Sequence, residues 1–230
     1  MRKLRILGLA LAIIGLLIIA ACVPFSFRGP ASGQQPYPYG PGGGMGPSMM
    51  GGGWGSYNPN PNTKPITIDQ AADAVKGYLS AYYGERLTLA EVMDFAWNYY
   101  AEVEEEDIGI HAMELLIDKY TGRVYPEYGP NMMWNTGYSP MGRMMGNYGG
   151  GSPTADMPVT PAQAKTLAQQ YLDTNLPGLI VADADTFYGY YTLHILQNGQ
   201  IEGMLSVNGY TGAIWYHTWH GPFLGMKEYD

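Results

Sequence analysis

The chain has 230 residues, which is enough for one large domain or two small ones. Its 12 Lys and Arg residues stand against 20 Asp and Glu residues, which gives a formal net charge of −8 at pH 7. We therefore do not expect nucleic acid or anionic lipid headgroups as partners, because both bind basic surfaces.

The N-terminus has the features of a secretory signal. The basic residues of MRKLR precede an uninterrupted apolar run of 16 residues, which is short for a membrane-spanning helix and typical of a signal peptide. The run leads into Ile19-Ala20-Ala21-Cys22, which resembles the lipobox of bacterial lipoproteins. The resemblance implies that residues 1–21 are removed. Cys22, the only cysteine, would then be acylated and become the first residue of the mature chain.

We therefore expect a lipid-anchored protein outside the cytoplasm, on the outer face of the cytoplasmic membrane or facing a periplasm. An uncleaved anchor helix and ordinary cleavage are the alternatives, and both leave the bulk of the protein on the same side. Residues 22–64 are predicted to form a disordered tether, because 29–63 lack charged side chains and consist largely of Gly, Pro, polar residues, Tyr and Met. Such a composition cannot bury enough apolar surface to fold.

Two later segments share the same helix signature. Thr67 and Gln70 have the spacing of a capping box, and apolar residues follow at helical intervals. Thr160 and Gln163 repeat this spacing, with Pro161 at the first helical position. Five pairs of identical residues lie 93 positions apart, which indicates an internal repeat: Thr67/Thr160, Gln70/Gln163, Ala71/Ala164, Tyr78/Tyr171 and Leu79/Leu172.

The regions after the two helices also match. Each alternates in the manner of half-buried strands and reaches a Tyr-Thr-Gly turn, at 120–122 and at 210–212. Asn198-Gly199 predicts a two-residue hairpin turn, and the acidic run at 102–109 is predicted to be a solvated turn. The sequence therefore predicts an α+β fold of two repeated units on the disordered tether. Each unit would have one helix packed on a three- to four-stranded antiparallel sheet.

The predicted units occupy residues 65–126 and 158–220, with a Gly/Met-rich linker at 127–157 and a C-terminal tail at 221–230. Units of about 60 residues are marginally stable alone, so we expect the two to pack together.

A capped helix that begins Thr-x-x-Gln-Ala, an aromatic strand, and a strand that runs into Asp/Asn-x-Tyr-Thr-Gly-x-Val/Ile together resemble the PepSY domain, over 66–126 and 159–217. The resemblance implies a non-catalytic module of secreted or membrane-anchored proteins, including peptidase propeptides, with a role in regulating a peptidase. It carries over no catalytic residues.

The sequence contains no His-Glu-x-x-His, Cys-x-x-Cys, Gly-x-Ser-x-Gly or phosphate-binding motif. His111 and His194 lie in predicted strands without a ligand-type residue two or four positions later, so we expect ordinary strand histidines. Asp183 and Asp185 lack the apolar sequence surroundings that raise the pKa of an acid–base carboxylate. We therefore expect no enzymatic activity.

Two functions remain open. One is a binding or regulatory module that contacts a protein partner through exposed sheet edges. The alternative is extracytoplasmic Cu(I) binding, because nine of the 14 Met residues lie in Gly-rich segments that cannot form a core, and thioether sulfur is a soft ligand that suits Cu(I). The candidate ligands are Met residues of the linker and a C-terminal His pair: Met132, Met133, Met141, Met144, Met145, His217 and His220.

If the linker binds copper, exchanging its five candidate Met residues for Leu lowers the Cu(I) affinity of the purified chain, because Leu keeps the apolar volume and lacks the sulfur ligand. Titration with Cu(I) against a competing chelator measures this affinity. An unchanged affinity would mean that the linker is an adaptable contact surface and that the two histidines pack on the sheet.

Overall fold

The structure is a computed structural model that describes residues 62–106, 108–139 and 155–229. The expected signal peptide, Cys22 and nearly all of the tether lie outside these residues, as do Met141, Met144 and Met145 of the linker. Within the described part of the chain, no helix has both the length and the apolar character needed to cross a membrane.

The helices and strands fall into two halves of the chain. The first half, residues 62–139, contains α1 (Ile68–Tyr82), the 3-10 helix η2 (Gly84–Arg86), β1 (Leu87–Phe95), β2 (Tyr99–Glu105), β3 (His111–Ile117), β4 (Val124–Pro126) and α2 (Pro130–Met133). The second half, residues 155–229, contains α4 (Pro161–Asn175), β5 (Ile180–Phe187), β6 (Tyr190–Gln197), β7 (Gln200–Asn208), β8 (Ile214–Tyr216) and β9 (Phe223–Glu228).

Local structure within each half follows from local sequence. Helix α1 begins at a capping box of Thr67 and Gln70, and α4 begins at the same arrangement of Thr160 and Gln163, as predicted. Such caps contribute about 1 kcal/mol each to helix stability. The predicted turn at Asn198-Gly199 also forms between β6 and β7, and its positive φ angles of 52° and 79° are those that an Asn-Gly hairpin favours.

The strands form one sheet rather than two separate sheets. Within the described residues, nine strands make a mixed sheet in the order β8-β7-β6-β5-β3-β2-β1-β9, with β4 paired to β3. All strand pairs are antiparallel except β3 with β5, where His111 lies opposite Phe187. Strand β9, in the segment predicted as a tail, pairs with β1 of the first half. The predicted fold class, two repeated helix-on-sheet units, is therefore wrong.

The physical reason for this error lies at the strand edges. An edge strand presents unpaired backbone N–H and C=O groups, which are stabilised when another strand pairs with them. Alternation and turn residues predict hairpins inside each half, but they carry no information on which edges meet. The β3–β5 and β1–β9 pairs join edges that lie far apart in the sequence.

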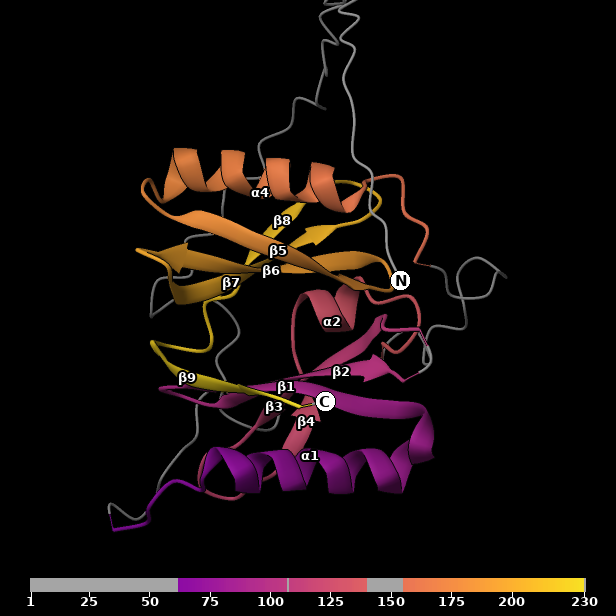
Figure 1. The fold of residues 1–230 in the computed structure, drawn as a ribbon, viewed down its shortest axis with the longest axis vertical. Coiled ribbons are helices and arrows are strands. Elements are labelled where there is room, and N and C mark those ends of the chain that lie inside the picture. The colour runs from indigo at the N-terminus through magenta and orange to yellow at the C-terminus, as the bar shows by residue number, and fades with distance from the viewer. Residues whose placement is uncertain (1–61, 107, 140–154, 230) are drawn as a thin grey trace, which may run out of the picture. The chain divides into compact units, whose positions relative to one another are not determined.

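Three groups of buried apolar residues hold the elements in place. One lies between α1 and the first-half strands, and another between α4 and the second-half strands (Figure 1). The third lies on the opposite face of the strands, where both halves contribute: Met93, Phe95, Tyr100, Leu116, Met204 and Trp219. Each half therefore covers its strands with a helix on one face and with the other half on the other face.

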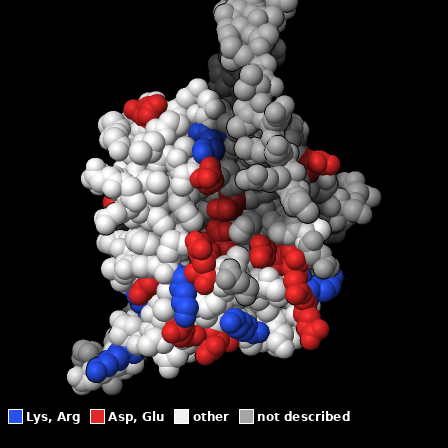
Figure 2. Space-filling view, in the orientation of Figure 1, with Lys and Arg blue, Asp and Glu red and all other residues white. Residues whose placement is uncertain are grey.

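Figure 2 shows acidic side chains gathered in the middle of one side of the molecule, where the surface is hollowed.

The segment after α2 connects the halves through backbone and side-chain hydrogen bonds. Thr136 N–H donates to Tyr188 O at 2.9 Å. The hydroxyls of Tyr138 and Tyr188 both donate to Glu105 Oε1, at 2.5 and 2.9 Å. The turn between β5 and β6 therefore lies directly against this segment.

Gly189 in that turn has a φ of +101°, and a Cβ atom there would overlap Trp134 O. We expect Gly189→Ala to lower the free energy of unfolding by about 2–4 kcal/mol, because it combines a left-handed backbone with a steric overlap. Gly77→Ala is the matched control, since Gly77 is an exposed helical residue with open space around it. It should stabilise the protein by about 0.5–1 kcal/mol. Chemical denaturation of both variants measures the two changes, and equal effects would contradict the close approach at Gly189.

Candidate functional site

The interior between the two halves contains carboxylates as well as apolar residues. Glu102, Glu114 and Glu127 are all 1 % exposed or less, and His217 and His220 are almost as deeply buried. Burying a carboxylate at such depth costs free energy unless hydrogen bonds or opposite charges compensate for its lost hydration. These residues therefore mark the part of the molecule where a function is most expected.

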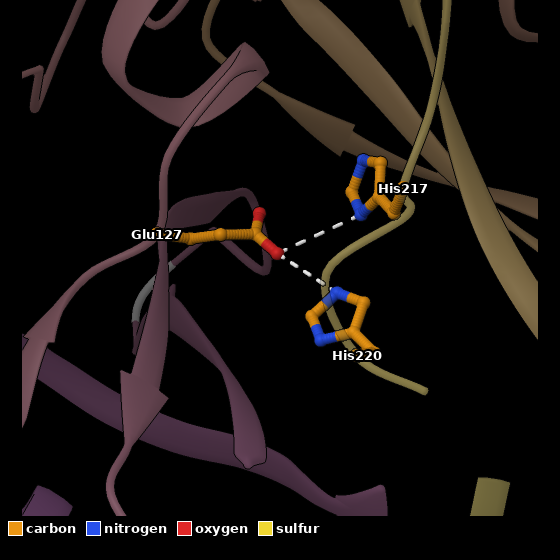
Figure 3. Close-up of side chains that lie close together, drawn as sticks. All are labelled: Glu127, His217 and His220. Atoms are coloured by element: carbon orange, nitrogen blue, oxygen red, sulfur yellow. Dashed lines mark ion pairs between the residues drawn. The ribbon is translucent and has the colours of Figure 1, made fainter. Parts of the chain in front are cut away.

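Glu127, His217 and His220 form a group in which all three residues are buried, and we call it the inner cluster (Figure 3). Glu127 follows β4, and both histidines follow β8, so the cluster joins the two halves. Glu127 Oε1 lies 3.6 Å from His217 Nδ1 and 3.1 Å from His220 Nε2. One ligand atom from each residue lies within 4.8 Å of the others. Two imidazoles and one carboxylate therefore converge on one point.

Hydrogen bonds outside the cluster fix the orientation of each member. Trp219 Nε1–H donates to Glu127 Oε1 at 2.9 Å. His220 Nδ1 lies 2.9 Å from Asn98 Oδ1, and the Asn98 amide Nδ2 donates to Trp219 O at 2.9 Å. His217 Nε2 lies 2.9 Å from Ser206 Oγ. Each imidazole is thus held through one nitrogen and turns its other nitrogen toward Glu127.

These contacts also determine which nitrogens carry protons. The Asn98 amide donates through Nδ2, so its Oδ1 must accept from His220 Nδ1–H, which leaves His220 Nε2 as a bare lone pair. Thr192 donates to Glu114, so Ser206 donates to Thr192 and must accept from His217 Nε2–H. Neutral His217 therefore presents a bare Nδ1. Neither of these nitrogens makes a hydrogen bond.

The protonation states support this assignment. Burial lowers the pKa of His220 to about 3 and that of His217 well below its ordinary value, so both rings are neutral at pH 7. Burial raises the pKa of Glu127 to about 8. Stacking holds the rings in place, His217 on Trp219 and His220 on Phe95, each at 4.6 Å between centroids. At pH 7 the Glu127 carboxyl therefore still holds a proton, and the inner cluster presents three electron-pair donors once that proton is released.

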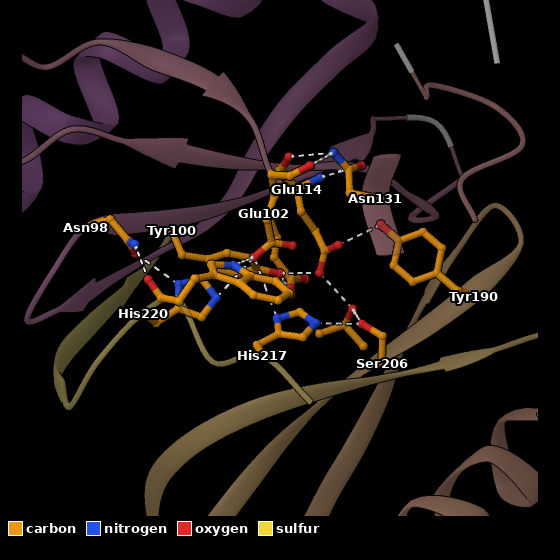
Figure 4. Close-up of polar contacts among 12 residues, drawn as sticks. Asn98, Tyr100, Glu102, Glu114, Asn131, Tyr190, Ser206, His217 and His220 are labelled. Atoms are coloured by element: carbon orange, nitrogen blue, oxygen red, sulfur yellow. Dashed lines mark hydrogen bonds and ion pairs between the residues drawn. The ribbon is translucent and has the colours of Figure 1, made fainter. Parts of the chain in front are cut away.

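Glu114 lies beside this cluster and is held by hydroxyl groups from both halves (Figure 4). Its Oε1 accepts from Thr192 at 2.7 Å and lies 2.8 Å from the Tyr100 hydroxyl, and its Oε2 accepts from Tyr190 at 2.8 Å. Tyr100 has a single proton, which it donates to Glu102 Oε1 at 2.6 Å. A continuous polar network therefore runs from Glu102 through Glu114 and Thr192 to His217.

The structure places the candidate copper ligands as follows. His217 and His220 lie together in the inner cluster, 5.7 Å apart between ring centroids. Met132 and Met133 lie on α2, with Met132 half-buried and the Met133 side chain 61 % exposed. The remaining linker methionines and the lipidation residue Cys22 lie outside the described residues.

Sequence reasoning missed the third member of the cluster. Glu127 stands 90 positions before His217, and no local spacing connects them. Two further interpretations also need correction. Glu102, at the start of the acidic run, is a buried strand residue rather than part of a solvated turn. Asp185 has surroundings that raise its pKa to about 7, chiefly through burial. Its neighbours Glu102, His111 and His194 come from other strands, so its own segment gave no signal.

Comparisons with known proteins give little beyond this geometry. No protein-family model matches the chain, and neither does any of the curated proteins. Among solved structures, the chain is similar to the Bacillus megaterium YpeB C-terminal domain, with 10 % sequence identity and a TM-score of 0.24. The match covers 66 % of this chain and 62 % of that one, which is less than two thirds of its length. A TM-score this low does not establish a shared fold, so the PepSY resemblance stays a prediction from the sequence.

Glu114 should make the stability of the protein depend on pH. Burial, together with the nearby Glu127 and Glu102, raises its pKa well above the ordinary value of 4.5. Its contribution to stability is therefore complete below about pH 4.5 and is lost as the pH rises toward the folded-state pKa. Glu114→Gln carries no such proton. Between about pH 5 and 8, its unfolding free energy should rise relative to that of the wild type by up to about 1.4 kcal/mol per pH unit. Denaturant titrations across this range measure the difference, and a difference independent of pH would show that Glu114 is ionised in the folded protein.

Proposed function

We propose that this chain is a non-catalytic, extracytoplasmic module that binds a divalent transition metal ion such as Zn²⁺. The ligands of this ion would be Glu127, His217 and His220. The observation that carries the proposal is the convergence of two imidazole lone pairs and one carboxyl on a single point, from which a metal ion would displace the carboxyl proton. His220 Nε2 and Glu127 Oε1 lie 3.1 Å apart, and both are acceptors when Glu127 is ionised. Two acceptors at this distance repel each other unless a cation or a proton lies between them.

The dimensions of the inner cluster suit a metal ion. A tetrahedral ion with bonds of about 2.0–2.1 Å separates its ligand atoms by about 3.3 Å. The two nitrogen–oxygen distances, 3.1 and 3.6 Å, lie on either side of this value. Two imidazoles and a carboxylate suit Zn²⁺ and related first-row ions better than Cu(I), whose preferred ligands are softer.

The hydrogen bonds that orient the residues of the inner cluster also resemble those around the ligands of metal sites. Metal-bound imidazoles commonly donate their other N–H to a fixed acceptor, which sets the tautomer. Here Asn98 and Ser206 accept those protons, and Trp219 orients the carboxylate. Because the cluster is buried, a bound ion would connect the first half to the C-terminal segment rather than meet a substrate. This burial supports a stabilising role.

The remaining parts of the proposal rest on the sequence. The N-terminal apolar run and the lipobox-like residues before Cys22 support a lipid anchor and an extracytoplasmic location. The PepSY-like motifs and the missing catalytic motifs support a regulatory module that acts on a protein partner, such as a peptidase, rather than an enzyme. The metal site would keep the two halves of this module in one arrangement.

Zinc should stabilise the folded chain. The full chain, purified in detergent and stripped with a chelator, should gain about 2–3 kcal/mol in unfolding free energy when free Zn²⁺ reaches about 100 times its dissociation constant. Glu127→Gln keeps the shape of the side chain and removes its charge, so it should weaken Zn²⁺ binding at least about tenfold. Thermal melting and isothermal titration calorimetry measure the two effects.

Glu105→Gln is the matched control for this experiment. Glu105 also bridges the halves, through the hydroxyls of Tyr138 and Tyr188, but it does not belong to the inner cluster. This variant should keep the Zn²⁺ affinity of the wild type. If Zn²⁺ leaves the melting temperature unchanged, or if Glu127→Gln binds Zn²⁺ like the wild type, a shared proton holds the cluster together and the metal proposal fails.

A further inference from the structure

A second group of histidines and carboxylates lines a surface cavity, apart from the inner cluster. A cavity of about 480 Å³ opens there. Five of its lining residues come from five different strands, and we call them the pocket cluster: Glu91 on β1, Glu102 on β2, His111 on β3, Asp185 on β5 and His194 on β6.

The sheet register places carboxylates side by side in an unusual way. Glu91 lies directly opposite Glu102 on the neighbouring strand, and Glu102 lies directly opposite Glu114 on the next one. Like charges in directly opposed positions destabilise a sheet, and burial increases the cost. Glu91 is 9 % exposed and Glu102 is 1 % exposed. Folding alone does not require this row of carboxylates, which therefore points to a binding role.

Irregularities in three strands turn side chains into the pocket. An extra residue, Ala90, interrupts the pairing of β1, so that Leu89 and Val92 both face α1 while Glu91 faces the pocket. Strand β3 has an extra residue at Ala112, directly after His111, and β5 has an extra residue shortly before Asp185. Bulges commonly re-aim side chains beside functional sites. Here three of them surround one cavity.

The pocket cluster contains two possible ligand sets that share one residue. Glu91, Glu102 and His194 form the first set, and in it one ligand atom of each residue lies within 4.8 Å of the others. The second set, Glu102, His111 and Asp185, meets the same distance. Glu102 Oε2 lies 2.8 Å from His111 Nδ1, and its other oxygen accepts from Tyr100. Glu102 is therefore the fixed centre of the pocket.

Some polar atoms aimed into the pocket have no hydrogen bond. Glu91 Oε1 and His194 Nε2 are both buried and lie 3.5 Å apart, as an ion pair when the imidazole is protonated, and beyond this contact neither atom makes a hydrogen bond. Buried polar atoms without a hydrogen bond are rare in folded proteins, and such atoms often serve as ligands of a bound ion. When all three carboxyls are ionised they outnumber the two imidazoles, so in that state the cavity attracts cations even with both imidazoles protonated.

We propose that this cavity is a second metal site, open to solvent, which takes a divalent first-row transition ion with Glu102 as the central ligand. Glu91 and His194 together with Glu102 form one set of ligands, and Asp185 and His111 together with Glu102 form an adjacent set. Mixed oxygen and imidazole ligands suit Mn²⁺, Fe²⁺ and Zn²⁺. The open cavity leaves room for water or an exchanging ligand on the ion, unlike the closed inner cluster. This proposal does not depend on a metal at Glu127.

Mn²⁺ tests the proposal directly, because the electron paramagnetic resonance signal of the free ion disappears when the ion binds. The measurement uses the full chain with Glu127→Gln, so that the inner cluster does not contribute. Mn²⁺ should bind, and both Glu102→Gln and Asp185→Asn should weaken this binding at least about tenfold. Asp185 lies at the rim of the pocket, with its side chain 34 % exposed, so Asp185→Asn keeps the fold even if Glu102→Gln does not.

Glu228→Gln is the control, since Glu228 is an exposed carboxylate that lines the same cavity without belonging to either ligand set. It removes the same charge and should change the affinity by less than about threefold. Pulsed resonance of the bound ion should also show a coupled imidazole nitrogen, and His194→Gln should weaken that signal. If Mn²⁺ fails to bind, or if Asp185→Asn has no larger effect than Glu228→Gln, the cluster is an ion-pair network and the proposal is wrong.

Discussion

The structure depends on the burial of carboxylates between its two halves. Glu102, Glu114 and Glu127 are almost inaccessible to solvent, and an uncompensated carboxylate at such depth costs several kcal/mol. Groups that compensate for this cost come from the opposite half: Tyr190 and Thr192 for Glu114, and Trp219 for Glu127. Separating the halves would expose an apolar cluster and would also leave polar groups on both sides without partners. The halves therefore form one cooperative body.

The single sheet brings the residues of the pocket cluster together. The parallel pair between His111 and Phe187 brings β3 beside β5, and thereby places His111 within 3.9 Å of Asp185. Strand β9 covers the opposite edge, at β1, and supplies Glu228 to the rim of the pocket. Two independent helix-on-sheet units would lack both contacts. The continuous sheet is thus the element that assembles residues from five strands around one cavity.

Much of the local structure could be predicted from the sequence, because its causes are local. The capping boxes at Thr67 and Thr160 and the turn at Asn198-Gly199 depend on residues within three positions of each other. The inner cluster could not be predicted in the same way. Its histidines, three residues apart, stand out as a pair in the sequence, but their carboxylate partner Glu127 becomes a neighbour only through tertiary folding.

The pocket cluster is hidden in the sequence for a related reason. The patterns around His111 and His194 predict ordinary strand histidines, since their own strands offer no second ligand at the right spacing. Period-two alternation also places Glu91 on the same face as Leu89, which packs against α1. A bulge reverses this orientation, and bulges leave no clear signature in the sequence of a strand. The residues that depart from simple alternation are therefore the ones that face the cavity.

The two clusters differ in access to solvent, and this difference determines what each can contribute. The ligand atoms of the inner cluster are buried, so the binding free energy of an ion there would add to the stability of the folded state. An ion in the pocket could exchange while the fold stays intact, because the cavity already opens to solvent. Tyr100 connects the two, since its hydroxyl lies within hydrogen-bond distance of Glu102 in the pocket and of Glu114 beside the inner cluster. A change of charge at Glu102 therefore alters the field at Glu114 and at Glu127, which couples the pocket to the inner cluster.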